Sequence, residues 1–520
     1  MSQKRLAKNI SVMSIAVFLS RILGLVRDQV MAFFFGGGFL NDAFNVAYNI
    51  PNLLRRLFGE GALSTAFVPL YNEIGIQKDK DSQTDFALNV LSILTLFLLI
   101  LTGLGIAFAP LIVRMLYPGL APETAVVAIK LTRIIFPYLF FIGLSSTFIA
   151  ILNSHDYFFM TGLSSALLNL GMIACIVIPY WVFGFSAERL IYIAGWGVAF
   201  GGALQTIVNF PFLKKIGYRI RLILRLTGSS IATLWKRFVP AMIGIGIREI
   251  NLIADALMAS FLPIGSITAL AYGNRLMQLP LGIFAISAGT AVLPTFSRLV
   301  SSKDYDQLNS SIRFTSLSLV YIMLPVTTLI LVLAPDFVSI LFGHGAFDDK
   351  AVLMSSQALV FYSLGLMFYS MNQVLTPVFY AHGDTKTPVK LAAAIVVLNI
   401  LLNLILMMFM QHRGLALSTS ITAFVNYLTL LWLLKKKISR LEYKSIFSNI
   451  LKGIAASAVV YLVARMLYGL LVFESKPGLL IKVSVISLIS FALFYLLGIL
   501  LKLSYFKEAG ESLWKRLRRR

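Results

Sequence analysis

Long apolar stretches alternate with short polar loops along almost the entire chain. Most stretches exceed about 18 residues, and about 20 helical residues cross the ~30 Å hydrocarbon core of a bilayer. Apolar and polar positions do not alternate as they do in barrel strands, so a β-barrel is not expected. We therefore predict an all-α polytopic membrane protein with about 14 transmembrane helices. The predicted spans are residues 10–35, 42–71, 86–113, 126–152, 159–184, 188–213, 238–262, 268–297, 314–342, 352–381, 388–410, 414–434, 447–471 and 478–501.

The chain also repeats itself at a nearly constant spacing. The matching segments are 47–48 and 271–272, 65–69 and 290–294, 78–81 and 303–306, and 168–169 and 398–399, with offsets between 224 and 230 residues. Helices 1–6 and 7–12 are therefore predicted to be two copies of one unit. Because six is even, both copies have the same orientation in the membrane. Two parallel six-helix repeats around a central cavity are typical of transporters in which one lobe rocks against the other.

The repeat and the basic stretches divide the chain into successive parts. These are an N-terminal six-helix lobe (1–213), a basic linker (214–237), a C-terminal six-helix lobe (238–434), a second basic linker (435–446), helices 13 and 14 (447–501) and a basic tail (502–520). Helices 13 and 14 lie outside the repeat and are predicted to be an addition to the two-lobe transporter plan.

Composition agrees with a membrane protein. The chain is 58% hydrophobic and 13% charged, with a mean hydropathy of +0.85. Its formal net charge is +23, but the basic residues lie mostly in short loops, which is typical of orientation signals and lipid headgroup contact. We therefore predict no nucleic-acid partner. The single cysteine, Cys175, lies in an apolar stretch, which excludes a disulfide framework and a cysteine-based metal site.

The positive-inside rule orients the chain. With a cytoplasmic N-terminus, the basic N-terminal segment, both basic linkers and the basic tail all lie in the cytoplasm. The opposite loops then hold only Arg114, Arg189, Lys350, Arg413, Lys476 and Lys482. This asymmetry predicts a multi-pass protein with both termini in the cytoplasm.

Ionisable groups inside the predicted spans are concentrated in the first two helices of each repeat. They are Arg21, Arg27 and Asp28 in helix 1; Asp42, Arg55, Arg56 and Glu60 in helix 2; Arg248, Glu249 and Asp255 in helix 7; and Arg275, beside Asn274, in helix 8. Each costs on the order of 2.5–3.5 kcal/mol to insert and usually faces a cavity or a partner. We interpret Arg56, Arg248 and Asp255 as structural, since Arg56 and Glu60 are spaced to pair. The remaining arginines are expected to face a cavity, where the planar guanidinium group suits phosphate oxygens.

Three further patterns bear on mechanism. Pro51 is expected to bend helix 2 just before its arginines. Gly36-Gly37-Gly38 has no Walker lysine and is expected to be a flexible periplasmic hinge. The D-x-D patterns at 79–81 and 304–306 lie in short polar loops, where helix caps are expected rather than a metal–nucleotide site. The four histidines show no ligand spacing, and no catalytic or nucleotide motif is present, so we predict no metal, no enzyme and no ATP-driven pump.

Several segments together form a specific pattern. They are residues 20–28 (SRILGLVRD), 41–44 (NDAF), 51–62 (PNLLRRLFGEGA), 274–277, 289–297 and 384–390. The chain thereby resembles the MurJ (MviN) lipid II flippases of the multidrug/oligosaccharidyl-lipid/polysaccharide exporter superfamily. The resemblance covers essentially the whole chain, including the two extra C-terminal helices.

The resemblance implies a flippase that moves lipid II, the undecaprenyl-pyrophosphate-linked peptidoglycan precursor, across the bacterial inner membrane by alternating access. The implied site consists of Arg21, Arg27, Arg55 and Arg275 at the pyrophosphate with Asp42 nearby, supported by Asp28, Arg56, Glu60 and Asn274. Helices 13 and 14 are implied to form a groove for the lipid tail. Some relatives carry acids beside the helix 8 arginine, whereas Asn274 and Gln278 stand here, which argues against a carboxylate relay at this place.

The expected partners are the lipid-linked precursor and membrane lipids, with cell-wall synthesis proteins as further candidates. No cofactor is expected, and transport would be coupled to the membrane potential or to an ion. Two alternatives are a flippase for another polyprenyl-linked glycan and a drug or cation antiporter, whose site would need carboxylates more than arginines. A membrane glycosyltransferase would need a metal or nucleotide site and larger extramembrane loops.

Overall fold

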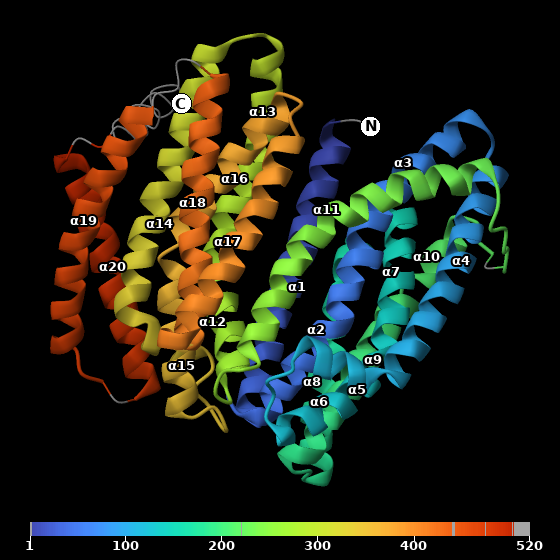
Figure 1. Ribbon diagram of the computed structural model, residues 1–520, viewed down its shortest axis with the longest axis horizontal. Coiled ribbons are helices and arrows are strands. Elements are labelled where there is room, and N and C mark those ends of the chain that lie inside the picture. Colours follow the sequence, from blue (N-terminus) through green and yellow to red (C-terminus); the bar gives the residue numbers. More distant parts are fainter. Residues whose placement is uncertain (1–2, 220, 439–442, 474, 502, 504–520) are drawn as a thin grey trace. The chain divides into compact units, whose positions relative to one another are not determined.

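The computed structural model describes residues 3–219, 221–438, 443–473, 475–501 and 503, and every regular element within them is a helix (Figure 1). The first elements are α1 (Gln3–Phe35), α2 (Phe39–Arg55), η1 (Arg56–Gly61), α3 (Ala62–Gln77), α4 (Lys80–Ala107), α5 (Ala109–Leu116), α6 (Pro122–Ile135), α7 (Pro137–Ser154), α8 (Phe158–Phe183), α9 (Ala187–Ile207), α10 (Phe210–Lys215) and α11 (Ser229–Ala259). They are followed by α12 (Ser266–Pro280), η2 (Leu281–Ile286), α13 (Ser287–Ser301), α14 (Tyr305–Leu341), α15 (Asp349–Ser363), α16 (Leu366–Ala381), α17 (Lys386–Met410), α18 (His412–Lys437), α19 (Tyr443–Leu470) and α20 (Lys476–Leu500).

The all-helical membrane fold is confirmed, but the count of 14 spans is not. Within the described residues, 10 helical segments are long and apolar enough to cross a membrane, or 11 if α15 and α16, bent by 44°, form one span. The predicted spans left over are 10–35, 42–71 and 238–262. Each of these three segments contains residues whose side chains lie outside the described part of the structure, namely 10–17, 59–62 and 247–248, so these three spans stay predictions.

The chain forms two compact units. Unit 1 comprises Met1–Ile267 with His344–Asp348, and unit 2 comprises Thr268–Gly343 with Asp349–Arg520. Helix α11, which corresponds to the first span of the predicted C-terminal lobe, belongs to unit 1 and packs along α3. The lobe and linker boundaries derived from the repeat stay predictions.

Small residues bring two helices of unit 1 close together. Helices α8 and α9 pack along each other, and a Cβ added to Gly171 would lie 2.8 Å from the Cα of Gly201. A Cβ on Gly197 would lie 2.9 Å from the Cβ of Cys175. Close backbone approach through small residues is a common way for helices to associate in membranes, where burial of apolar surface gives little driving force. Cys175 thus serves as one of the small packing residues.

Both copies of the repeat contain a π-helical turn at the same place. Helix α2 ends at Arg55, η1 follows over Arg56–Gly61, and α3 continues the chain; in unit 2, η2 occupies Leu281–Ile286 between α12 and α13. Positions 56 and 281 are 225 residues apart, within the offset of the repeat. A proline precedes each turn, Pro51 in α2 and Pro280 at the end of α12. The expected disturbance of helix 2 is therefore a π-helical turn, a feature that often marks functional sites.

The D-x-D patterns are helix caps, as the sequence predicted. Asp79 accepts a hydrogen bond from the backbone N–H of Ser82 at 2.6 Å, and this bond lowers the pKa of its carboxyl group. Asp304 accepts the equivalent bond from Gln307 at 3.0 Å at the start of α14. A carboxylate at this position satisfies one of the amide groups left open at a helix start. Helix capping thus accounts for both aspartates, and no nucleotide site has to be invoked.

A buried ion pair connects α20 to α14 in unit 2. Lys482 Nζ lies 3.2 Å from Asp336 Oδ2, and each side chain is only 7% exposed. The same Nζ lies 3.4 Å from the ring centroid of Tyr468 on α19. Apolar residues Leu333, Ala464 and Ile486 pack around the pair. Lys482 therefore lies inside α20, as the predicted span 478–501 has it, and not in the loop to which the charge count assigned it. Its charge is balanced by a carboxylate from a neighbouring helix.

The substitution Lys482→Met should destabilise the protein by about 3–5 kcal/mol, since it leaves the carboxylate of Asp336 buried without its cation. The double variant Asp336→Leu/Lys482→Met should recover most of that loss, because a well-packed apolar pair replaces a buried ion pair at little cost. Thermal unfolding in detergent of the wild type, both single variants and the double variant tests this. A double variant no more stable than Lys482→Met would refute the coupling.

Candidate functional site

Arg27 is buried and held by groups from neighbouring helices of unit 1. Its Nε and Nη2 donate to Asp28 Oδ1 at 3.1 and 2.7 Å, and its Nη1 donates to Asn169 Oδ1 on α8 at 3.0 Å. Asn169 in turn donates to the backbone carbonyl of Ser20 at 3.3 Å. The guanidinium carbon lies 6.0 Å from the ring centroid of Tyr48 on α2. The charge of Arg27 is thus balanced by its neighbour in sequence, and its orientation is fixed by α8.

The other two arginines predicted for the cavity in this unit are more accessible. Arg55 is half-buried and its Nε donates to Asn52 Oδ1 at 3.0 Å, one turn earlier in α2. Arg21 is exposed on α1, six residues before Arg27. Arg27 and Arg55 therefore have different amide partners, Asn169 and Asn52. Their role at a phosphate stays a prediction.

Arg56 has a partner that sequence spacing did not suggest. Its Nε lies 3.3 Å from Glu249 Oε2 on α11, and the Glu249 side chain is 7% exposed. This contact joins the start of the π-helical turn η1 to α11, so it ties the irregular part of helix 2 to the first helix of the second repeat. The side chains of Glu60, the partner predicted from the i,i+4 spacing, and of Arg248 lie outside the described part of the structure. The contact with Glu249 therefore supports the interpretation of Arg56 as a structural residue.

Asp42 holds the turn that follows α11. Its side chain is buried, and Oδ2 accepts a hydrogen bond from the backbone N–H of Gly265 at 2.6 Å. Gly265 has a φ of +93°, a conformation that glycine adopts without strain. Asp42 thus stabilises a turn within unit 1. Its place near the pyrophosphate stays a prediction.

The turn between α1 and α2 is closely packed. Gly36 has a φ of +64°, and a Cβ there would lie 2.4 Å from the carbonyl oxygen of Ala346. Asn41 donates to the carbonyl of Gly36 at 2.6 Å, and the N–H of Ala346 donates to the carbonyl of Phe33 at 2.8 Å. A packed turn at Gly36 thus takes the place of the flexible hinge expected from the glycine run.

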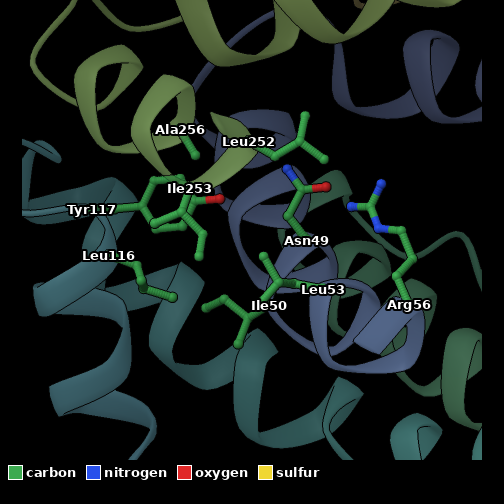
Figure 2. A pocket seen from close by; sticks show the side chains of 9 residues that line it. All are labelled: Asn49, Ile50, Leu53, Arg56, Leu116, Tyr117, Leu252, Ile253 and Ala256. Atoms are coloured by element: carbon green, nitrogen blue, oxygen red, sulfur yellow. The ribbon is translucent and has the colours of Figure 1, made fainter. Parts of the chain in front are cut away.

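A small cavity lies beside Arg56 in unit 1 (Figure 2). Its volume is about 100 Å³, and its lining is apolar except for Asn49, Arg56 and Tyr117. Burial raises the pKa of Tyr117 to about 12, although a hydrogen bond with Asn49 acts in the opposite direction. A space of this size suits a few water molecules and not a glycan. This cavity is therefore too small to hold the headgroup of a lipid-linked glycan.

The site residues predicted for unit 2 lie on α12. Arg275 is exposed, and Asn274 accepts a hydrogen bond from Gln278 Nε2 at 3.0 Å. Positions 274 and 278 are thus occupied by amides that bind each other. This pairing gives no group that can release a proton near neutral pH.

The repeat contains a useful signal that the sequence analysis did not exploit. Asn169 in α8 corresponds to Asn399 in α17, and both are buried. In unit 1 the asparagine binds Arg27, whereas in unit 2 Asn399 accepts from Asn403 at 3.0 Å and lies 3.4 Å from the hydroxyl groups of Ser418 and Thr422. The repeated asparagine could have been proposed as a partner of a buried charge. The contacts of Glu249 and Gly265 depend on tertiary packing and leave no such signal.

Comparisons with known proteins give a consistent result. The model of the family described as lipid II flippase MurJ matches residues 31–491. The protein named "Probable lipid II flippase MurJ" from Buchnera aphidicola subsp. Baizongia pistaciae is 32% identical over 465 residues, covering 88% of each chain. The protein named "Lipid II flippase MurJ" from Burkholderia cenocepacia is 32% identical over 428 residues, covering 81% of this chain and 82% of its own.

Solved structures agree with this result. The structure titled "Lipid II flippase MurJ, inward closed conformation" aligns with a TM-score of 0.78 at 30% identity, covering 94% of this chain and 98% of its own. An inward-facing multidrug resistance transporter of the MATE family aligns with a TM-score of 0.69 at 14% identity, covering 84% of this chain and 99% of its own. At that identity the second match shows a shared fold alone.

The substitution Asp42→Ala should destabilise the protein by about 1–3 kcal/mol, because it leaves the buried N–H of Gly265 without an acceptor. Asp42→Asn should cost much less, since its amide oxygen can accept the same bond. Exposed Asp81→Ala serves as the control and should change stability by no more than about 0.5 kcal/mol. Thermal unfolding in detergent measures all three. Equal losses for Ala and Asn would show that the charge, and not the hydrogen bond, stabilises this turn.

Proposed function

Because the chain belongs to the lipid II flippase MurJ family, we propose that it carries lipid II from the cytoplasmic to the periplasmic leaflet of the membrane. The chain is a transporter in peptidoglycan synthesis and not an enzyme. We propose alternating access as the mechanism, since an internal repeat of parallel six-helix units is typical of transporters that open to either side.

The observation that carries this proposal is the family match over nearly the full chain. The chemistry of the arginines supports it. A pyrophosphate offers several anionic oxygens, and a guanidinium group binds such oxygens through paired N–H donors. Drug and cation antiporters would instead need anionic side chains at the site. We propose that Arg21, Arg27, Arg55 and Arg275 engage the pyrophosphate, with Asp42 and the supporting residues Asp28, Arg56, Glu60 and Asn274 nearby.

The ion pair of Arg27 and Asp28 gives this binding a means of release. A guanidinium group has five N–H donors, so a phosphate oxygen can add to or replace the contacts with Asp28 and Asn169. When the headgroup leaves, Asp28 restores the balance of charge around Arg27. Binding thus exchanges one anion for another and does not have to expose an isolated cation in the membrane. This exchange favours reversible binding, which transport needs.

The chain is a multi-pass protein of the bacterial inner membrane. We propose that both termini lie in the cytoplasm, on the strength of the distribution of lysine and arginine. We propose no cofactor. An anionic headgroup that moves outward is favoured by an inside-negative membrane potential, by about 2.3 kcal/mol per charge per 100 mV. Membrane lipids and the lipid-linked precursor are its partners, and cell-wall synthesis proteins are proposed as further ones.

The substitution Arg275→Ala should abolish precursor export while leaving the protein inserted and folded, since Arg275 is exposed on α12. The assay uses bacteria depleted of their own flippase. A periplasmic probe that cleaves or labels only outward-facing lipid II then reports export by the expressed chain.

Arg298→Ala is the matched control for this assay. Arg298 is an exposed arginine in the last turn of α13, in the same unit, and its replacement should leave export at the wild-type level. Wild-type export by Arg275→Ala, with the protein present in the membrane, would remove Arg275 from the site. Loss of export in both variants would point to a general effect of surface charge.

The proposed orientation predicts which loops a membrane-impermeant maleimide can reach. In a Cys175→Ser background, Lys350→Cys should be labelled in spheroplasts, and Lys436→Cys only after lysis. Both lysines are exposed, so access to the reagent depends on the side of the membrane alone. Labelling of Lys436→Cys in sealed spheroplasts would reverse the assigned topology.

A further inference from the structure

Residues 221–227 have no regular secondary structure and contact the first half of α4, within unit 1. The N–H of Arg225 donates to Asn89 Oδ1 at 2.7 Å, and Asn89 Nδ2 donates back to the carbonyl of Arg225 at 2.9 Å. The N–H of Ile223 donates to Ser92 Oγ at 3.0 Å. Two polar side chains of α4 thus hydrogen-bond the backbone of this strap, as a neighbouring strand would.

These contacts place the strap at the membrane boundary. Asn89 and Ser92 lie three and six residues inside the predicted span 86–113, which is roughly 5–9 Å along a helix axis. Non-helical backbone at such a depth is tolerated only where protein groups satisfy its N–H and C=O groups. Asn89 and Ser92 meet that requirement. The strap is therefore built to lie at the level of headgroups and upper acyl chains rather than in the aqueous loop region.

The side chains of the strap suit that level. Leu222 and Leu226 are 82% and 66% exposed, which is unfavourable in water but favourable against lipid. Arg225 and Arg219 are exposed, and neither makes an ion pair within the described part of the chain. Arg221 differs, since it pairs with Asp85 at 2.5 Å. The strap thus combines leucines for the bilayer with two cations that carry no carboxylate partner.

An apolar groove lies next to the strap. It has a volume of about 380 Å³ and is walled by α4, by the start of α11 and by residues around η1. Its lining is entirely apolar and includes Ile93, Leu94 and Phe97 on one side and Leu234 and Trp235 on the other. Ile93 is one turn after Asn89, which binds the strap, and Leu234 comes nine residues after Arg225. The wall of the groove and the strap are thus connected through neighbouring residues of α4.

Further positive charge stands at the same end of α11. Lys236 is exposed and makes no ion pair in the described residues, whereas Arg237 pairs with Glu73 at 3.0 Å. Trp235, between the groove and the surface, is 50% exposed, as expected of a tryptophan at a membrane interface. An apolar groove whose walls continue into a strap and a helix start that carry exposed cations matches an acyl chain joined to an anionic headgroup.

We propose that this groove and strap form a binding site for an anionic membrane phospholipid, separate from the substrate site. One acyl chain lies in the groove between α4 and α11, and the phosphate headgroup is held by Arg225 and Lys236, with Arg219 contributing charge. Since α11 also carries Glu249, the partner of Arg56, a lipid here stabilises the same helix that borders the irregular turn of helix 2.

The test measures quenching of Trp235 fluorescence by phospholipids brominated in the acyl chains. The other four tryptophans, Trp181, Trp196, Trp432 and Trp514, are replaced by Phe in the full-length chain, which is reconstituted in neutral bilayers. Brominated phosphatidylglycerol should quench Trp235 at concentrations lower than brominated phosphatidylcholine by roughly fivefold for each cation involved. Arg225→Gln and Lys236→Gln should each weaken that preference by roughly fivefold.

Two controls keep the result specific. Lys215→Gln removes an exposed charge of the same kind at the end of α10 and should leave the preference unchanged. A variant that retains only Trp181, which is 79% exposed on α8, should be quenched equally by both lipids. If the single-tryptophan chain does not fold, native mass spectrometry replaces the quenching assay. It compares the phosphatidylglycerol that stays bound to the wild type with the amount bound to each charge variant.

Equal quenching by the two headgroups, or a preference that survives both charge substitutions, would overturn the proposal. Relief of quenching by undecaprenyl phosphate, but not by added phosphatidylglycerol, would also overturn it, because the groove would then take the polyprenyl chain. None of these outcomes would affect the proposed transport of lipid II, which the precursor assay tests separately.

Discussion

A charge inside a bilayer must have a partner, and this constraint explains most of the irregular features of unit 1. Arg27 is balanced by Asp28 and oriented by Asn169, while Arg56 is balanced by Glu249 from α11. These contacts connect α1 with α8, and η1 with α11. The same rule holds in unit 2, where Lys482 and Asp336 connect α20 to α14. Helices that would be too polar to insert alone are thus accommodated by pairing within each unit.

The two copies of the repeat share a π-helical turn and a buried asparagine, but these features have different neighbours in each copy. Each contains a π-helical turn 225 residues from its counterpart, and each has a buried asparagine in the corresponding later helix. In unit 1 the turn begins with Arg56 and the asparagine serves Arg27, whereas in unit 2 the turn begins with Leu281 and Asn399 binds other uncharged groups. The proposed phosphate contacts are therefore assigned to the copy in which an arginine is already oriented by a buried amide. Arg275 is the arginine proposed for the site from unit 2.

Hydropathy and repeat spacing predicted the helical membrane fold. The length of a membrane-spanning apolar segment is set by bilayer thickness, so each such segment can be recognised from its own residues. The D-x-D caps were also predictable, since a cap depends on residues three positions apart. The partners of Arg56 and Asp42 were not, because Glu249 and Gly265 are distant in sequence and meet them only through packing. The spans 10–35, 42–71 and 238–262 stay predictions, because each contains residues outside the described part of the structure. Those segments contain most of the candidate site residues.

The most direct test of the central claim is transport by the purified chain in liposomes that contain lipid II with a label on its peptide. A membrane-impermeant reagent added outside measures the fraction of lipid II that becomes accessible with time. A flippase predicts that this fraction rises beyond the initial outer-leaflet pool only when the chain is present, and faster when a potential favours movement of anions toward the reagent. An accessible fraction equal to that of protein-free liposomes, with the chain folded and inserted, would contradict the proposed function.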